Sequence, residues 1–197
     1  MKNVSGKGAL AREAISKAAV DLFSRQGYTG TTMRDIAAEV GLLPGSLYAH
    51  IKNKEELLAD IVEKGIADFL AIEEEVKRSN DPADVRIRRA VASHVKFVAD
   101  DPERMLIVFH QWRYLSGKKR DRAVEMRHSY ALMHSNLLQE GIDEGIFRSN
   151  IDVKVEVYFL LGALNWIPEW YRSEGKYSPN DIAKQVSETY ILAMRKK

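Results

Sequence analysis

The stretch GLLPGSLYAHIKNKEEL, residues 41–57, contains one helix start that is followed at once by another. Pro44 presets the backbone for a first helical position, and Asn53 is placed to cap the next helix. Between these starts, Leu47 and Ile51 lie four residues apart, so the short helix has a single narrow apolar face. We infer a helix that packs through its rear and exposes its front.

Two helices are expected upstream of this short helix. Apolar residues recur at helical spacing over residues 15–23, and Gly27 is placed for a left-handed cap. Thr32, followed three residues later by Asp35, predicts a capping box at the start of the second helix, which stops at Gly41. The second helix and the short third helix are therefore joined by about three residues, the geometry of a helix-turn-helix.

The front of this motif carries side chains that suit DNA. Leu43 and Pro44 offer apolar surface for a thymine methyl group, and Arg34 can take guanine bidentately. Hydroxyl and ammonium groups at helix starts reach phosphates. The predicted DNA-contacting residues are Thr32, Arg34, Leu43, Pro44, Gly45, Ser46, Tyr48, His50 and Lys54. Each of them alone would also fit a plain three-helix cap, with Tyr48 half-buried and Lys54 solvated, but their joint spacing favours DNA binding.

Composition limits the class of protein. The chain has 197 residues, of which 45% are hydrophobic and 29% charged, as in globular proteins. Residues 1–54 hold eight Lys/Arg against four Asp/Glu, so a polyanion partner is allowed at the front of the chain. No apolar run reaches the roughly 18 residues of a membrane span, and the first residues lack a secretory signal. We expect a cytoplasmic protein with no membrane partner.

Catalytic and metal-binding patterns are missing from the sequence. There is no cysteine, which excludes disulfides and thiolate sites. His128 and His134 lie six residues apart and so fall on different helix faces. The sequence also lacks a zinc-protease motif, a nucleophile elbow, a phosphate loop and a glycine-rich dinucleotide turn. We therefore expect no enzyme, no catalytic residue, no metal and no cofactor.

The rest of the chain is predicted to be helical as well. Capping residues precede proline at residues 81–82, 101–102 and 178–179. Gly117 separates a sixth from a seventh helix. The prediction is an all-α fold of nine helices in two domains. Residues 1–53 form a DNA-binding head, of which residues 1–11 are a mobile arm, and residues 54–197 form a body for ligand binding and dimerisation.

Apolar stripes in the body fit either a ligand pocket or a close-packed core. Residues 105–115 are apolar nearly all round, and residues 157–172 carry an aromatic stripe with a kink expected at Pro168. Aromatic stripes at helical spacing are more often core, whereas tryptophan and methionine with embedded polar groups suit an adaptable pocket. The residues predicted to contact a ligand are Met105, Phe109, Trp112, Arg113, Met133, Asn165, Trp166 and Trp170.

Residues 12–57 resemble the N-terminal domain of the tetracycline-repressor (TetR) family of bacterial transcription regulators. The likeness rests on the Gly-Tyr and Thr-Thr pairs around the first two helices, Gly-Ser-Leu-Tyr in the third and Lys-Glu opening the fourth. Ile51 replaces a usual phenylalanine, and Pro44 stands where many members carry lysine, so specificity leans on Arg34 and apolar contacts. The resemblance implies a repressor that binds a near-palindromic operator as a homodimer and is released by a small apolar effector.

The family resemblance also implies a four-helix interface between the last two helices of each subunit. Gly162 and Ala163 would let another helix approach closely, and the last helix offers an apolar face. The predicted dimer-interface residues are Gly162, Ala163, Ile182, Val186 and Tyr190.

A narrower likeness bears on the effector. Residues 162–183 are similar to the C-terminal end of a TetR subgroup that governs lipid or sterol breakdown and senses coenzyme A thioesters. The basic cluster GKKRDR, residues 117–122, could neutralise the phosphates of such a ligand or be a solvated loop. Two alternatives stay open: a TetR-type regulator of drug efflux that senses lipophilic compounds, and a helical carrier or enzyme without DNA binding.

Overall fold

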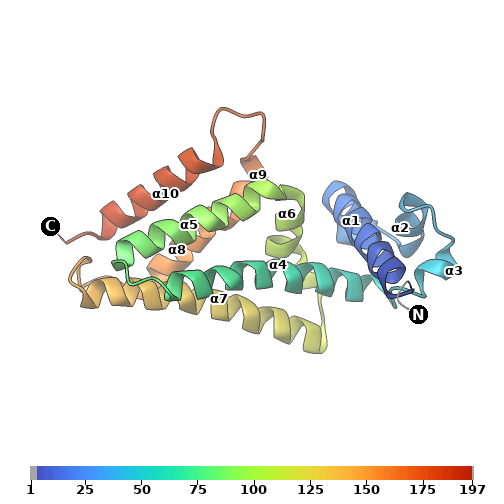
Figure 1. Ribbon diagram of the computed structural model, residues 1–197, viewed down its shortest axis with the longest axis horizontal. Coiled ribbons are helices and arrows are strands. Elements are labelled where there is room, and N and C mark those ends of the chain that lie inside the picture. Colours follow the sequence, from blue (N-terminus) through green and yellow to red (C-terminus); the bar gives the residue numbers. More distant parts are fainter. Residues whose placement is uncertain (1–3, 197) are drawn as a thin grey trace. The chain divides into compact units, whose positions relative to one another are not determined.

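The computed structural model describes residues 4–196, and of these it describes all side chains except those of residues 4–7, 72–75 and 77. The regular elements of the described chain are all helices (Figure 1). Its elements are α1 (Val4–Gly30), α2 (Met33–Glu39), α3 (Pro44–Leu47), α4 (Lys54–Lys77), α5 (Ala83–Asp100), α6 (Pro102–His110), the 3-10 helix η1 (Gln111–Tyr114), α7 (Gly117–Asp143), α8 (Val153–Asn165), α9 (Ile167–Trp170) and α10 (Pro179–Met194). The predicted all-α fold is confirmed, and the only strand-like pairing within residues 4–196 is an isolated bridge between Phe147 and Arg195.

The nine-helix order is recovered when α8 and α9 are counted as one interrupted helix and η1 as the end of α6. Pro168 does more than kink its helix. Because proline has no N–H to donate to the Leu164 carbonyl, α8 ends at Asn165, and the four-residue α9 starts afresh around the proline. At the other end of the chain, residues 4–11 of the predicted mobile arm are the first turns of α1, and residues 1–3 lie outside the described residues.

The chain divides into two compact units. The first unit contains the residues up to Gly65 together with Glu103–Ala123, and the second contains Ile66–Pro102 and Val124–Lys197. The helix α4 therefore contributes its first half to one unit and its second half to the other. In the first unit, α6, η1 and the start of α7 fold with the helix-turn-helix, and the functional boundary after residue 53 stays a prediction.

In the first unit, the expected local signals set the helix boundaries. Gly27 breaks α1 with a φ of 78°, and Gly41 follows α2 with a φ of 66°, both in the left-handed region that glycine tolerates. Thr32 and Asp35 form the predicted capping box. At the start of α4, the Asn53 side chain accepts a hydrogen bond from the backbone of Glu56 at 2.8 Å.

The core of the first unit is closed by α4 and α6. Their contact is tight at Gly65, where an added Cβ would overlap the Val108 side chain. Glycine is thus the residue that lets α4 approach α6. Of the apolar side chains expected to pack behind the short helix, Val40 is half-buried, and the others are buried: Leu22, Phe23, Ile36, Ala37, Leu47 and Ile51.

In the second unit, α10 packs along α5, and α5 also contacts α8 and α9 (Figure 1). The end of α10 is tied to the turn after α7, because Arg148 N donates to Met194 O at 3.0 Å and Lys196 N donates to Ile146 O at 3.2 Å. Phe147 lies in this turn with its ring against Gly141. No helix within residues 4–196 is long and apolar enough to cross a lipid bilayer.

Candidate nucleic-acid interface and dimer face

The short helix α3 projects its front and buries its rear. Leu43 precedes the helix in an extended conformation with 77% of its surface exposed, and Pro44 occupies a first helical position. Gly45 and Ser46 are exposed, whereas Leu47 is fully buried. The exposed turn can therefore approach a groove while its rear stays packed on α2.

All nine predicted DNA-contacting residues lie at the surface of the first unit. Seven of them are exposed, and they are Thr32, Arg34, Leu43, Pro44, Gly45, Ser46 and Tyr48. His50 and Lys54 are half-buried. The backbone N–H and the side-chain hydroxyl of Thr32 donate hydrogen bonds to the carboxylate of Asp35, at 2.8 and 2.7 Å. These bonds lower the pKa of Asp35 and fix the start of α2.

Lys54 has a structural partner that the sequence did not indicate. Its Nζ donates to the backbone carbonyls of Tyr28 and Thr31 at 2.6 and 2.7 Å, and it lies 4.2 Å from the centre of the Tyr28 ring. Burial lowers the pKa of this ammonium group. Lys54 therefore joins the start of α4 to the end of α1, an arrangement that competes with a direct phosphate contact.

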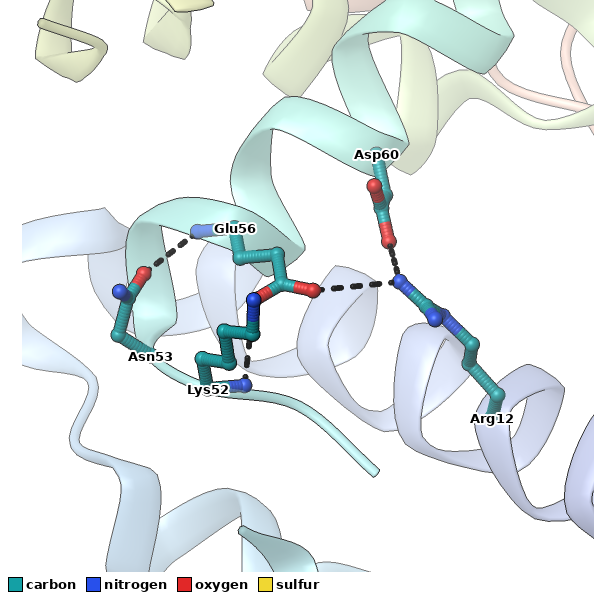
Figure 2. Close-up of polar contacts among 5 residues, drawn as sticks. All are labelled: Arg12, Lys52, Asn53, Glu56 and Asp60. Atoms are coloured by element: carbon teal, nitrogen blue, oxygen red, sulfur yellow. Dashed lines mark hydrogen bonds and ion pairs between the residues drawn. The ribbon is translucent and has the colours of Figure 1, made fainter. Parts of the chain in front are cut away.

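A second link between α1 and α4 centres on Arg12 (Figure 2). Its guanidinium lies 2.6 Å from the Asp60 carboxylate and 3.5 Å from that of Glu56. Glu56 also accepts the backbone N–H of Lys52 at 3.2 Å, so one carboxylate serves both α1 and the chain that leaves α3. Arg12 and Asp60 lie 48 positions apart, and no spacing rule could have paired them.

Residues 111–116 pack against α1 and α4. The Gln111 side chain donates to the Phe23 carbonyl at 3.0 Å, and the Tyr114 ring stacks on Tyr28 with centroids 5.2 Å apart. The backbone N–H and the hydroxyl of Ser116 each donate to Glu55 at 2.8 Å. These bonds lower the pKa of Glu55. This segment therefore contacts the last turns of α1 and the start of α4.

The predicted ligand-contacting residues are divided between the units. In the first unit, Met105 and Phe109 are buried, Trp112 is half-buried and Arg113 is exposed. In the second unit, Met133 is buried and Asn165 half-buried. Trp166 and Trp170 are 58% and 46% exposed, so neither is a core residue of the single chain. Of the basic cluster at 117–122, Arg122 pairs with Glu63 at 2.8 Å.

Buried polar residues that sequence reasoning passed over lie in the second unit. His94 on α5 and Tyr130 on α7 are in hydrogen-bond contact at 3.0 Å, and the His134 ring meets the Tyr130 ring edge to face. Phe69 on α4 packs on His94 and Tyr130. Helical spacing predicts that Tyr130 and His134 are neighbours on α7, but it gives no hint of His94 and Phe69, which come from two other helices.

The helix α8 is apolar on two faces. One face is buried and contains Val157, Leu160, Leu161 and Leu164. The other is exposed and contains Val155, Tyr158, Phe159, Gly162, Ala163 and Trp166, a set that we call the α8 apolar face. Phe159 is 67% exposed, and nothing lies within 4 Å of a Cβ added at Gly162. A helix that is hydrophobic all round is usually buried on both sides, so we expect a second polypeptide surface to cover the α8 apolar face.

The remaining residues predicted for the dimer interface are placed differently. Ile182 and Tyr190 are 5% and 4% exposed within the single chain, because this face of α10 packs on α5 of the same chain. They have almost no surface left to offer a second subunit. Val186 is half-buried, whereas Gly162 and Ala163 are exposed on the α8 apolar face.

An exposed recognition helix on an all-α scaffold defines the class of helix-turn-helix DNA-binding regulators. Two family profiles match the chain. The profile of the bacterial regulatory proteins of the tetR family matches residues 15–61, and the profile described as the tetracyclin repressor-like C-terminal domain matches residues 80–194. The chain belongs to the TetR family of transcriptional regulators, and it is not an enzyme.

Individual relatives span nearly the whole chain. The HTH-type transcriptional repressor KstR2 of Mycolicibacterium smegmatis is 31% identical over 186 residues, which cover 91% of this chain and 86% of that protein. KstR2 of Rhodococcus jostii is 29% identical over 192 residues, covering 93% and 90%. Among solved structures, AibR in complex with isovaleryl coenzyme A and operator DNA superposes with a TM-score of 0.82 at 25% identity, covering 90% of this chain and 96% of AibR.

Proposed function

We propose that this protein represses transcription by binding a near-palindromic operator as a homodimer, and that a bulky apolar effector releases it. The proposed effector is an acyl or sterol-derived coenzyme A thioester, and the proposed site of action is double-stranded DNA in the cytoplasm. The observation that carries the DNA-binding part is the exposure of Pro44, Gly45 and Ser46 above the fully buried Leu47.

The proposed contacts divide into base-reading and phosphate-binding groups. Leu43 and Pro44 face thymine methyl groups, and the exposed Arg34 takes a guanine. Thr32 and Tyr48 contact phosphates and position the helix without reading sequence. Lys54 acts through its bonds to the end of α1, which keep α4 in register with the recognition helix.

Dimerisation is proposed through the α8 apolar face. A second copy of the chain would cover Phe159 and Trp166, and the open space over Gly162 lets the two α8 helices approach closely. The dimer must hold its two copies of α3 about 34 to 36 Å apart, or a multiple of this distance, to enter major grooves on one face of the DNA.

Release follows from a change in this separation. Because Gln111, Tyr114 and Ser116 contact the ends of α1 and the start of α4, an effector that shifts α6 and η1 moves the helix-turn-helix. To take operator occupancy from nearly full to nearly empty, the effector must prefer the released state about 10⁴-fold, or 5.5 kcal/mol. The isovaleryl coenzyme A bound by AibR supports the effector class.

A footprint of the purified protein on the DNA beside its own gene tests the DNA-binding part. We expect a protected near-palindrome whose half-sites are about one helical turn apart. Uniform coating of the fragment with no protected site would reject the operator proposal. Mass spectrometry of molecules that copurify with the protein tests the effector class, and a bound lipophilic cation would replace the thioester by the ligand of an efflux regulator.

A further inference from the structure

A buried polar cluster in the second unit joins three helices. It consists of Phe69 on α4, His94 on α5, and Tyr130 and His134 on α7, which are 2%, 0%, 7% and 2% exposed. The Nδ1 atom of His94 lies 3.0 Å from the hydroxyl of Tyr130. The His134 ring is perpendicular to the Tyr130 ring, with centroids 4.9 Å apart, and Phe69 lies 4.5 Å from His94. The cluster is therefore a small group of buried polar atoms surrounded by aromatic rings.

The Nε2 atom of His134 in this cluster has an unused hydrogen-bonding capacity. Within the described part of the chain, His134 Nε2 is buried and has no hydrogen-bond partner. Buried polar atoms in native proteins are almost always paired, and an exception calls for an explanation such as a functional role. Neutral imidazole carries one donor and one acceptor nitrogen, so Nε2 is able to donate to a carbonyl oxygen in the tautomer that places the proton there.

The same interior does not suit an ionic group. Burial lowers the pKa of His94 to about 3 and that of His134 to about 4, so both rings are neutral at pH 7. The buried polar residues among those described are Thr31, His94, His134 and Ser187, and no Asp, Glu, Lys or Arg is among them. A carboxylate or an ammonium group placed here would lose its hydration without gaining a counter-ion.

We propose that His134, supported by Tyr130 and His94, binds the carbonyl oxygen of an acyl thioester effector whose apolar chain enters among α4, α5 and α7. This inference rests on the proposed function and adds a selection rule to it: the buried end of the effector is uncharged and carries a hydrogen-bond acceptor. The charged coenzyme A portion stays outside this cluster.

Matched ligands test the rule on the unmodified protein. Butyryl-, octanoyl- and palmitoyl-coenzyme A are compared with S-alkyl coenzyme A thioethers of equal chain length, which lack only the carbonyl oxygen. Fatty acids and alkyltrimethylammonium ions of the same lengths complete the panel. Binding to the DNA-free dimer is measured by calorimetry, and release of labelled operator is measured separately by fluorescence anisotropy.

We expect the best thioester to bind about tenfold more tightly than its thioether, as one hydrogen bond to a buried group allows. The fatty acid and the cation should bind more weakly than either. The variant His134→Phe should bring the thioester and thioether affinities together. His128→Phe should keep the tenfold ratio, because His128 is an exposed histidine on the same helix.

Equal affinities of thioester and thioether in the unmodified protein would overturn the inference, and so would tighter binding of the carboxylate or the cation, or no binding of any thioester. None of these results would contradict the proposal that the protein binds an operator. Conversely, a thioester that binds selectively through His134 without releasing the operator would support the carbonyl site and reject the proposed mode of regulation.

Discussion

Lowering the pH from 7 to 5 tests the burial of His94 and His134. Burial lowers the pKa of His94 to about 3 and that of His134 to about 4, whereas an ordinary histidine titrates near 6.5. Below pH 6.5 the unfolded chain therefore takes up protons that the native chain does not. The free energy of unfolding falls as the pH drops through this window, and the loss ends only when the native histidines titrate.

The size of the loss follows from the two shifted pKa values. Each histidine changes the free energy of unfolding by up to 1.36 kcal/mol per pH unit. Together the two histidines should lower the free energy of unfolding by about 3 to 4 kcal/mol between pH 7 and 5. That is a large share of the 5 to 15 kcal/mol typical of a folded domain. Asp35 and Glu55 have lowered pKa values, and their contribution is lost only at lower pH, below roughly 4.5.

Urea unfolding followed by circular dichroism, at one protein concentration and several pH values, measures this loss. His134→Phe removes one of the two buried titrating rings, so the slope between pH 6 and 5 should fall by about half. The exposed His128→Phe variant should keep the full slope. If the unmodified protein is equally stable at pH 7 and 5, the cluster is hydrated, and the argument from its burial fails.

Three other substitutions test separate parts of the molecule. Phe159→Ala should weaken dimerisation by about 2 kcal/mol per subunit in analytical ultracentrifugation, since the ring is 67% exposed on the single chain, while the exposed Leu10→Ala on α1 should leave the dimer intact. Gly141→Ala should destabilise the fold by about 1 to 3 kcal/mol in urea unfolding, because the added Cβ overlaps a buried phenylalanine ring; unchanged stability would contradict this packing. Arg34→Ala should cost about 1 to 3 kcal/mol at one base pair, whereas Tyr48→Phe should weaken binding to operator and random DNA alike; equal losses on all sequences for Arg34→Ala would remove its base-reading role.

Local sequence signals predicted the helix-turn-helix closely. Each of these signals acts only on the few residues around it. In the structure, Gly27 and Gly41 have positive φ angles, Thr32 caps α2, and Pro44 starts α3. Such signals need no knowledge of the rest of the chain. The buried rear and exposed front of α3 follow from them, because a single turn has room for only one apolar side.

Contacts between distant segments were beyond the reach of spacing rules. Arg12 and Asp60 are 48 positions apart in the sequence, and His94 and Tyr130 are 36 positions apart, and each pair joins two different helices. Lys54 shows the same limit: as a first-turn lysine it suggested a solvated or phosphate-binding group, yet it is committed to two carbonyls of α1. Helical periodicity gives the direction of a side chain around its axis, but not the partner that it meets.

The same limit applies to the dimer face and the ligand site, and both assignments stay predictions. Ile182 was predicted to be an interface residue because its face of α10 is apolar. In the single chain this face packs against α5. Trp166 looked like a pocket residue because it is aromatic, and it stands exposed on the α8 apolar face. Both the buried and the exposed face of α8 are apolar, so its second face remains uncovered in the single chain. The exposure of Trp166 favours the proposed interface. The buried Nε2 of His134, a histidine that the sequence analysis named only in excluding a metal site, is the proposed polar contact of the effector.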